Sequence, residues 1–432
     1  MREMKDSGIE WVGAIPQDWQ LSKIGSLYTQ RNEKVSDKDY QPLSVTMQGI
    51  LPQLATAAKT DDGDNRKLVR VGDFAINSRS DRRGSCGISP LDGSVSLINI
   101  ILTPRTAMHP GYYNWLFHTT LFADEFYKWG HGIVADLWTT RWQEMKSITV
   151  PVPEYAEQER IAAFLDAECA EIDAVLEKTH ASIEEYKKLK QAVITQAVTK
   201  GIRGDRPMKD SGIEWIGDIP ESWEVSSVRY IGQLQNGISK GGEFFGKGFP
   251  FVSYGDVYKN YELPHSVSGL IDTTEDERAT YSVEYGDIFF TRTSETIEEV
   301  GFSCVCKRSI PNATFAGFII RLRPFCADEK ILTDYAKYYF RGEHIRAYLV
   351  KEMNLVTRAS LGQTLLKGMS VIVPPKSVQK EIAEYLDDKC ADIDALIAKK
   401  QQYLTEIENY KKSLIYEYVT GKKEVKTSVL AD

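Results

Sequence analysis

Residues 4–19 read MKDSGIEWVGAIPQDW, and residues 208–223 read MKDSGIEWIGDIPESW. Twelve of these sixteen positions are identical, at a constant offset of 204 residues. Each copy carries the pattern Trp-x-Gly-x-Ile-Pro-x-x-Trp. Such close self-similarity within one chain indicates that a whole structural unit is duplicated.

A second repeated block follows each large segment. Residues 158–166 read QERIAAFLD and residues 379–387 read QKEIAEYLD, an offset of 221 that also pairs Ile172-Asp173-Ala174 with Ile393-Asp394-Ala395. The repeats predict the order A–B–A′–B′, with about 200 residues per unit. The predicted segments are 1–153, 154–204, 205–375 and 376–432.

The two B segments are predicted to be long helices. Their apolar residues recur in alternating steps of four and three without an intervening Pro or Gly, which is typical of a coiled-coil seam. About 40 residues at ~1.5 Å each make a rod of roughly 60 Å. The predicted seam consists of Leu165, Ile172, Leu176, Ile183 and Val193 in the first helix, and Leu386, Ile393, Ile397, Leu404, Ile407 and Leu414 in the second.

Two equivalent seams in one chain can bury each other. The alternative is that each helix packs only on its own domain, as most amphipathic helices do. Length and heptad regularity favour pairing of the two helices. Lys190 and Lys411 occupy equivalent seam positions and are expected to set register or orientation.

The two A segments are predicted to be α/β domains. Short β-rich runs lie among turns marked by Gly and Pro, and aromatic amphipathic stretches predict helices. The β-rich runs are Val95–Leu102 and Phe315–Leu322, the helical stretches are Tyr112–Trp129 and Leu332–Leu349, and the Gly-Asp pairs at 72–73 and 286–287 each open a strand. Between their shared ends the A segments diverge, which suits one scaffold that presents two different surfaces.

The composition predicts a cytoplasmic globular protein without a membrane span. Hydrophobic residues make up 42% of the 432 residues, no apolar run approaches the ~20 residues of a span, and the polar N-terminus predicts no secretory signal. The six cysteines are scattered, which does not indicate a disulfide framework. For Cys304-Val305-Cys306, two buried small residues are favoured over half of a metal site.

The formal charge of −8 argues against a general nucleic-acid binder. Counted by segment, residues 1–153 hold 17 basic and 17 acidic residues, and residues 205–375 hold 19 and 23. The acidity is therefore spread over the chain, and a local basic cleft in either A segment stays open.

Several enzyme motifs are missing from the sequence. His-Glu-x-x-His, Gly-x-Gly-x-x-Gly and the Asn/Asp-Pro-Pro-aromatic motif of adenine methyltransferases are absent. Residues 241–248, GGEFFGKG, nearly match a phosphate-binding loop, but Gly248 replaces the Mg²⁺-binding Ser or Thr. We therefore expect no catalytic and no metal site, and interpret 241–248 as a flexible loop that contacts a phosphate backbone.

Candidate DNA contacts lie on loops that follow strands. Arg pairs bidentately with guanine and Asn with adenine, and Arg or Lys neutralises phosphates. Residues 77–84, NSRSDRRG, are the clearest such loop, and 291–294, TRTS, are its counterpart. A plain solvated loop is the alternative for any single residue. The predicted contacts are Asn77, Arg79, Arg82 and Arg83 in the first A segment, and Lys240, Lys247, Arg292 and Thr293 in the second.

The ordered set of motifs resembles the specificity subunits of Type I restriction-modification systems. The resemblance rests on the Trp-x-Gly-x-Ile-Pro-x-x-Trp entrances, the Gly-Asp strands, Val-Pro-x-Pro at 150–153, Gln-Glu-Arg-Ile-Ala at 158–162 and Val-Thr-Lys-Gly at 198–201. It extends over nearly the whole chain. The second exit departs from the pattern and reads Val-Pro-Pro at 373–375.

The resemblance implies target-recognition domains at 1–153 and 205–375, joined by spacer helices at 154–204 and 376–432 in an antiparallel coiled coil. Each domain would read one half of a split, asymmetric site in double-stranded DNA. Two methyltransferase subunits would dock on the helices and supply S-adenosylmethionine chemistry. Motor-nuclease subunits would use ATP and Mg²⁺. This chain itself would be non-catalytic and would hold no cofactor.

Two other functions stay open from the sequence. A duplicated coiled-coil scaffold without a DNA role would suit the acidic charge. A nuclease built on scattered acidic residues would be revealed by metal-dependent cleavage.

Overall fold

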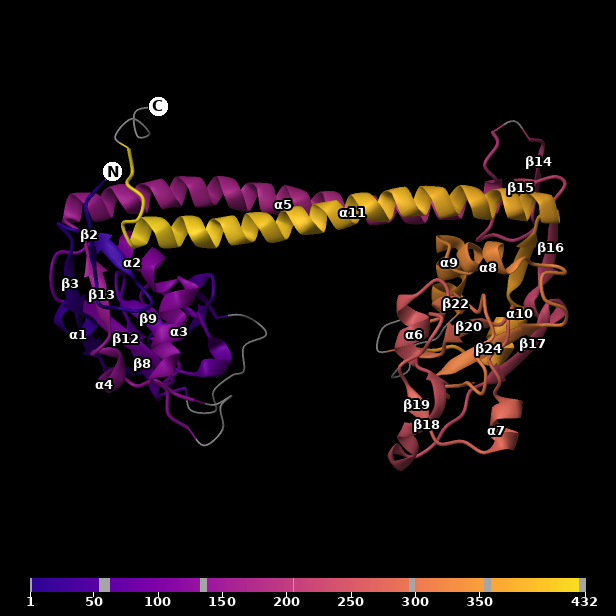
Figure 1. Ribbon diagram of the computed structural model, residues 1–432, viewed down its shortest axis with the longest axis horizontal. Coiled ribbons are helices and arrows are strands. Elements are labelled where there is room, and N and C mark those ends of the chain that lie inside the picture. Colours follow the sequence, from indigo (N-terminus) through magenta and orange to yellow (C-terminus); the bar gives the residue numbers. More distant parts are fainter. Residues whose placement is uncertain are drawn as a thin grey trace. The chain divides into compact units, whose positions relative to one another are not determined.

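The computed structural model describes residues 2–53, 63–132, 138–204, 206–294, 300–352 and 359–426 (Figure 1). By its internal contacts the chain forms two compact units. The first unit comprises residues 1–180 and 401–432, and the second comprises residues 181–400. Each unit contains one mixed α/β domain and a segment of each of two long helices. The predicted fold class, two α/β domains with two long helices, is confirmed.

Each domain is built around a four-stranded antiparallel sheet with the same strand topology. In the first unit the order is β10 (Cys86–Ile88), β9 (Phe74–Asn77), β12 (Asn99–Pro104) and β4 (Tyr28–Arg31). In the second unit the order is β22 (Ser303–Val305), β20 (Ile288–Thr291), β24 (Ile319–Pro324) and β17 (Gly232–Asn236). Strand β9 therefore corresponds to β20, and β12 corresponds to β24.

Shorter elements surround each sheet. In the first unit they are β1 (Met4–Asp6), β2 (Ala14–Pro16), β3 (Gln20–Lys23), α1 (Ile24–Leu27), β5 (Lys34–Val35), β6 (Leu43–Thr46), β7 (Gly49–Pro52), β8 (Arg66–Val69), η1 (Ser80–Arg82), β11 (Gly93–Val95), α2 (Pro110–Phe117), α3 (Thr120–Lys128), α4 (Trp142–Met145) and β13 (Thr149–Val152). In the second unit they are β14 (Met208–Asp210), β15 (Asp218–Pro220), β16 (Glu224–Ser227), η3 (Val228–Tyr230), η4 (Gly242–Phe244), β18 (Phe245–Val252), α6 (Tyr254–Lys259), β19 (Leu270–Ile271), α7 (Glu275–Thr280), β21 (Thr293–Ser294), β23 (Thr314–Phe315), α8 (Thr333–Tyr339), α9 (Glu343–Glu352), β25 (Ala359–Ser360), α10 (Gln363–Gly368) and β26 (Ser370–Val373).

Several predicted elements are divided in the structure. The stretch 112–129 forms α2 and α3 instead of one helix, because the Thr119 side chain caps α3 by accepting a hydrogen bond from the Phe122 N–H. The stretch 332–349 likewise forms α8 and α9. Each predicted β-rich run contains a tight turn before its main strand, at residues 97–98 and 317–318.

The repeated Gly-Asp pair explains how the central strands begin. Gly72 and Gly286 both have a φ of +87°, which favours glycine, and the aspartate that follows each is buried. Asp73 accepts hydrogen bonds from the Arg70 backbone N–H at 2.9 Å and from Arg31 Nε at 2.7 Å. Asp287 accepts them from the Glu284 backbone N–H and from Arg323. These carboxylates join the turn to neighbouring strands, so the motif is structural in both domains.

The two long helices are α5 (Tyr155–Lys200) and α11 (Lys376–Val419), of 46 and 44 residues. In the first unit the Phe164 and Tyr418 rings lie 4.4 Å apart, and Lys411 Nζ lies 2.6 Å from the Asp173 carboxylate. Because residue numbers rise along α5 as they fall along α11, the helices pair antiparallel in this unit (Figure 1). Within the described residues, no helix is both long and apolar enough to span a bilayer.

The second unit repeats this pairing. Lys190 Nζ lies 2.6 Å from the Asp394 carboxylate, and Lys400 Nζ lies 5.7 Å from the Tyr186 ring centroid. Each seam lysine therefore bonds the aspartate of the repeated Ile-Asp-Ala motif on the other helix. Among the predicted seam residues, Leu165, Ile183, Leu386, Ile393, Leu404 and Leu414 are buried, and Ile172, Leu176, Val193, Ile397 and Ile407 are half-buried. Supercoiling of the pair stays a prediction.

Residues near the repeated sequences attach each domain to the ends of α5 and α11. The Tyr112 hydroxyl donates to the Val419 carbonyl at 2.8 Å, and the Tyr335 hydroxyl donates to the Val198 carbonyl at 3.1 Å. Trp19 and Trp223 are buried at these junctions. The first domain thus packs on the start of α5 and the end of α11. The second domain packs on the end of α5 and the start of α11. The boundaries between the compact units fall inside both predicted spacer segments, at residues 180–181 and 400–401. The division of the chain into four segments remains a prediction.

A glutamine near the start of each long helix adds further hydrogen bonds between that helix and its domain. The Gln158 side chain accepts a hydrogen bond from the His109 N–H and donates to the Pro153 carbonyl, both at 2.9 Å. The Gln379 side chain accepts from the Leu332 N–H and donates to the Pro374 carbonyl. The Gln of each repeated block is thus a structural residue that joins strand, helix and domain.

His344 on α9 is buried without a hydrogen-bond partner. Its ring centroid lies 4.8 Å from that of Tyr339 and 6.1 Å from that of Trp215. Neither ring nitrogen is hydrogen-bonded within the described part of the chain. Burial lowers the pKa of His344 from 6.5 to about 3.

The depressed pKa of His344 predicts acid sensitivity of the second unit. Between pH 6.5 and 3 the unfolded chain binds a proton that the folded chain excludes, so the free energy of unfolding falls as pH falls. At pH 5 the loss is about 2 kcal/mol. His344→Phe keeps an aromatic ring in the core and should remove this loss, whereas replacing the exposed His265 with Gln should not. Urea unfolding at pH 7.5 and 5 measures it, and an unchanged pH dependence for His344→Phe would contradict the assignment.

Candidate nucleic-acid interface

In the first unit the predicted loop at 77–84 leaves the end of central strand β9. Its backbone is held by three hydrogen bonds: Ser78 N–H donates to the Ile98 carbonyl at 3.2 Å, Thr140 N–H donates to the Ser78 carbonyl at 2.9 Å, and Ser80 N–H donates to the Trp138 carbonyl at 2.9 Å. The loop is therefore an ordered platform at one end of the sheet.

Asn77 faces into this platform. Its side chain is buried, its amide oxygen accepts a hydrogen bond from the Arg79 N–H at 3.0 Å, and its carbonyl accepts one from the Tyr127 hydroxyl at 2.9 Å. In this arrangement Asn77 shapes the loop and does not present its amide to solvent. The structure thus gives it a supporting role in place of the predicted base contact.

The three arginines of the loop differ in their surroundings. Arg79 is exposed, and among the described residues its guanidinium has no partner. The Arg82 side chain is 70% exposed and lies 3.9 Å from Asp81. Arg83 instead pairs with Asp124 and lies over the Tyr127 ring. Arg79 and Arg82 are the two cations that this loop can offer to DNA without breaking a close ion pair.

The second unit builds the same platform from different residues. Arg292 N–H donates to the Phe318 carbonyl at 2.9 Å, and Leu361 N–H donates to the Arg292 carbonyl at 2.7 Å. These bonds match those of Ser78, so Arg292 takes the place of Ser78, and Thr293 takes that of Arg79. Thr293 pairs with Ser360 in the β21–β25 ladder, as Arg79 pairs with Thr139. Arg292 and Thr293 are half-buried.

The two predicted lysines of the second domain are not equivalent. Lys240 donates to Glu277 at 2.6 Å and to the Asp272 carbonyl at 2.9 Å, and its side chain is only 14% exposed. This ion pair ties Lys240 to α7, so the structure makes it a bridge between loop and helix. Lys247 is exposed on β18 between Gly246 and Gly248, both with positive φ. It remains available to a phosphate.

The near match to a phosphate-binding loop has the wrong structure for one. Residues 242–244 form the short helix η4, and Gly248 lies inside strand β18. A phosphate-binding loop instead leads from a strand into a helix that begins at its Lys-Ser/Thr. The predicted loop at 241–248 instead forms η4 and the first part of β18, in which Phe245 pairs with Ile271 of β19.

The cysteine pair is buried as expected of two small core residues. Burial raises the pKa of the Cys306 thiol to about 12 and that of Cys304 still further. Both thiols are protonated at neutral pH and are poor nucleophiles or metal ligands. In the ranges that the structure describes, no group of His, Cys, Asp and Glu is arranged to hold a metal ion.

Two exposed apolar residues at the platforms were missed by the sequence analysis. Ile98 is 37% exposed and Phe318 is 64% exposed, at matching positions in the two units. Both lie within the predicted β-rich runs, and the sequence pattern singled out neither of them. The signal available in the sequence was Gly317, which marks a turn directly before Phe318.

The fold and these platforms define a class of protein: one α/β scaffold present twice, with shared junctions to two long helices and different exposed surfaces at the sheet ends. The family model described as "Type I restriction modification DNA specificity domain" matches residues 220–408. Residues 220–408 thus resemble this family's domain, and the relatives that match along most of the chain are named Type I restriction enzyme specificity subunits.

The relatives match along most of the chain. The Type I restriction enzyme EcoKI specificity subunit of Escherichia coli (strain K12) is 22% identical, over 95% of this chain and 90% of that protein. The MjaVIII specificity subunit of Methanocaldococcus jannaschii is 23% identical, over 95% and 94%. A solved structure titled as the basis of complex assembly and conformational transition of the Type I R-M system matches with a TM-score of 0.71 at 14% identity, over 95% of this chain and 99% of that one.

Proposed function

We propose that this chain is the non-catalytic DNA-recognition subunit of a Type I restriction-modification enzyme, and that each domain reads one half of a split, asymmetric site. One observation carries the proposal: the same scaffold occurs twice, its repeated residues at the helix junctions are structural, and its residues at the sheet ends differ between the two copies. Duplicated modules on a common spacer suit two half-sites, and unlike surfaces suit unlike half-sites.

The repeated residues support this division of roles. Trp19 and Trp223 are buried at helix junctions, and Gln158 and Gln379 join helix to strand. At the platforms the residues change: Ser78, Arg79 and Ile98 in the first unit correspond to Arg292, Thr293 and Phe318 in the second. Differences at the sheet ends would alter which bases are read and leave the shared helix junctions intact.

The helices support docking of two copies of one partner, for which methyltransferase subunits are our proposal. In the first unit Val175 and Tyr410 are 38% and 54% exposed, and in the second unit Leu396 and Leu189 are 42% and 48% exposed. Val175 and Leu396 are repeat mates, as are Leu189 and Tyr410, at the offset of 221. Two equivalent apolar patches suit two identical subunits.

The remaining partners follow from the family resemblance as proposals. The methyltransferase subunits would supply S-adenosylmethionine chemistry on adenine, and motor-nuclease subunits would use ATP and Mg²⁺. The two helices would set the gap between the half-sites. The complex would act in the cytoplasm on host and invading DNA.

The test is to co-express this chain with the methyltransferase subunit of its system and to map methylated adenines across the host DNA. We expect a split motif, with two short, unlike half-sites separated by a fixed unspecified gap. A complex that forms and carries a competent methyltransferase, yet yields no such motif, would contradict the proposal and leave a duplicated interaction scaffold. The net charge of −8 is the observation that favours that alternative.

A further inference from the structure

The turn before central strand β24 holds an aromatic ring in solvent. Phe318 is 64% exposed, although it lies between the buried residues Phe315 and Ile319. Exposed apolar area costs about 25 cal/mol per Å² relative to burial, but a single exposed ring is common on protein surfaces. What distinguishes Phe318 is its position on a turn that both units share.

The turn holds this ring in a defined place. The Phe318 carbonyl accepts the Arg292 N–H at 2.9 Å, and the Ile319 N–H donates to the Ala316 carbonyl at 3.0 Å. A Cβ at Gly317 would lie 2.2 Å from Ser239 Oγ, so a larger residue there would force the Ser239 side chain to move. Because the backbone is already ordered, a ligand that touches the ring would lose little free energy in ordering the turn.

Polar groups able to read bases surround the turn. Asn236, at the end of β17, pairs with Ile320 of β24, and its amide oxygen accepts a hydrogen bond from Gln363 Nε2 at 3.0 Å. Arg292 is joined to Phe318 by the backbone bond given above, and Thr293 follows it. Residues that carry amide, guanidinium and hydroxyl groups therefore lie next to the turn in the backbone pairing, and these are groups able to read base edges.

The first unit repeats the turn with another side chain. The Ile98 carbonyl accepts the Ser78 N–H at 3.2 Å, and the Asn99 N–H donates to the Ser96 carbonyl at 3.1 Å. Ile98 and its neighbour Leu97 are 37% and 38% exposed. Both units therefore extend an apolar side chain from the same turn, and the two side chains differ in size and shape.

We propose that Phe318 and Ile98 are specificity-determining residues, each making an apolar contact with a thymine 5-methyl group in the half-site of its own domain. The inference rests on the proposed function and adds the chemistry of one contact in each half-site. Apolar contact with the thymine methyl is one of the recurrent direct readouts of the major groove. It suits both an aromatic and an aliphatic side chain, whereas stacking on a base would need a ring at both positions.

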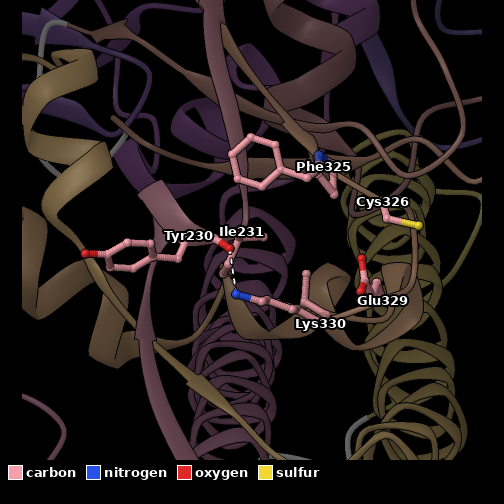
Figure 2. Close-up of a pocket in the computed structure, with 8 residues that line it drawn as sticks. Tyr230, Ile231, Phe325, Cys326, Glu329 and Lys330 are labelled. Carbon is pink, nitrogen blue, oxygen red and sulfur yellow. Dashed lines mark hydrogen bonds between the residues drawn. The ribbon is translucent and has the colours of Figure 1, made fainter.

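Phe325 provides a matched control on the same strand. It is 63% exposed, follows the opposite end of β24, and lines a shallow pocket of about 90 Å³ with Tyr230 and Lys330 (Figure 2). In that pocket Lys330 Nζ donates to the Tyr230 carbonyl at 3.0 Å. Phe318→Ala and Phe325→Ala remove equal rings of equal exposure from the two ends of one strand, so neither should unfold the domain.

The experiment measures binding of the complex with its methyltransferase subunit to duplexes that carry the mapped wild-type motif, with each thymine in turn replaced by deoxyuridine. For the wild type, one replacement in one half-site should weaken binding by roughly 3- to 10-fold. The Phe318→Ala variant should bind the unmodified duplex more weakly than the wild type by a similar factor. Its binding should not change further when that same thymine is replaced by deoxyuridine. Phe325→Ala should behave as the wild type. Ile98→Ala should abolish sensitivity to a thymine in the other half-site.

The outcomes separate this inference from the proposed function. If the wild type methylates a split motif but Phe318→Ala binds as the wild type, or keeps its sensitivity to the same thymine, the assignment of Phe318 is wrong. It is equally wrong if no thymine in the half-site responds to loss of its methyl group. A wild-type complex without any split motif overturns the proposed function itself, and with it the contact.

Discussion

Replacing Arg79 and Arg82 together with alanine is expected to weaken recognition of one half-site by roughly 30- to 25,000-fold, because each base-edge contact contributes about 1–3 kcal/mol. Both guanidiniums are exposed on an ordered loop, and Arg79 has no partner within the described residues. The salt dependence of binding should also become shallower, by about one unit of slope for each lost phosphate contact. Binding of the complex to duplexes altered in one half-site at a time measures both effects.

Arg83→Ala is the control within the same loop. Because Arg83 already pairs with Asp124 and lies over Tyr127, its loss should change DNA binding far less than the double replacement. A double variant that loses both half-sites equally would show that the loop acts on the whole assembly, and a variant that loses neither would remove the loop from the interface.

Replacing Leu386 with aspartate should destabilise the second unit by about 4 kcal/mol or more. Leu386 is fully buried and shares a core with Ile194 and Ala197 of α5 and with Trp223 of the domain. Losing a core leucine costs about 2–5 kcal/mol, and burying a carboxylate adds to this cost. For a unit of this size the melting temperature should fall by roughly 10 °C. Thermal unfolding followed by circular dichroism measures it.

Ala391→Asp is the matched control on the same helix. It adds the same charge at an exposed position, where we expect a loss of about 0.5 kcal/mol from helix propensity alone. Equal melting temperatures for the two variants would mean that α11 does not contribute its apolar face to the core. Loss of methyltransferase binding by Leu386→Asp alone would follow from the loss of the helix pair.

The helices were the most predictable part of the molecule. Heptad spacing places Leu165 on the apolar face of α5 and Leu386 on the apolar face of α11. The burial of these faces could be predicted from the periodicity alone. The repeated motifs likewise identified the two domains. Their role at the junctions was not predictable, because the Tyr112 hydroxyl bonds a carbonyl 307 residues away in sequence.

The candidate contacts were predictable as loops but not as individual residues. Lys240 and Lys247 have the same side chain in the same stretch, yet Lys240 is bound to Glu277, 37 residues later, and Lys247 is exposed. Asn77 turns inward to bond its own loop, and Phe318 turns outward from a run that reads as core. A side chain's direction depends on partners that local sequence does not identify.

The sequence by itself determined the duplication, the two long helices, the α/β class and the resemblance to specificity subunits. These features are encoded in short repeats and in apolar periodicity, which act between near neighbours along the chain. Only the tertiary structure decided which arginines of the 77–84 loop lack a close ion pair within the described residues, and that Ile98 and Phe318 occupy one equivalent exposed turn. Those features depend on long-range hydrogen bonds, ion pairs and burial, which form only when distant segments of the chain pack together.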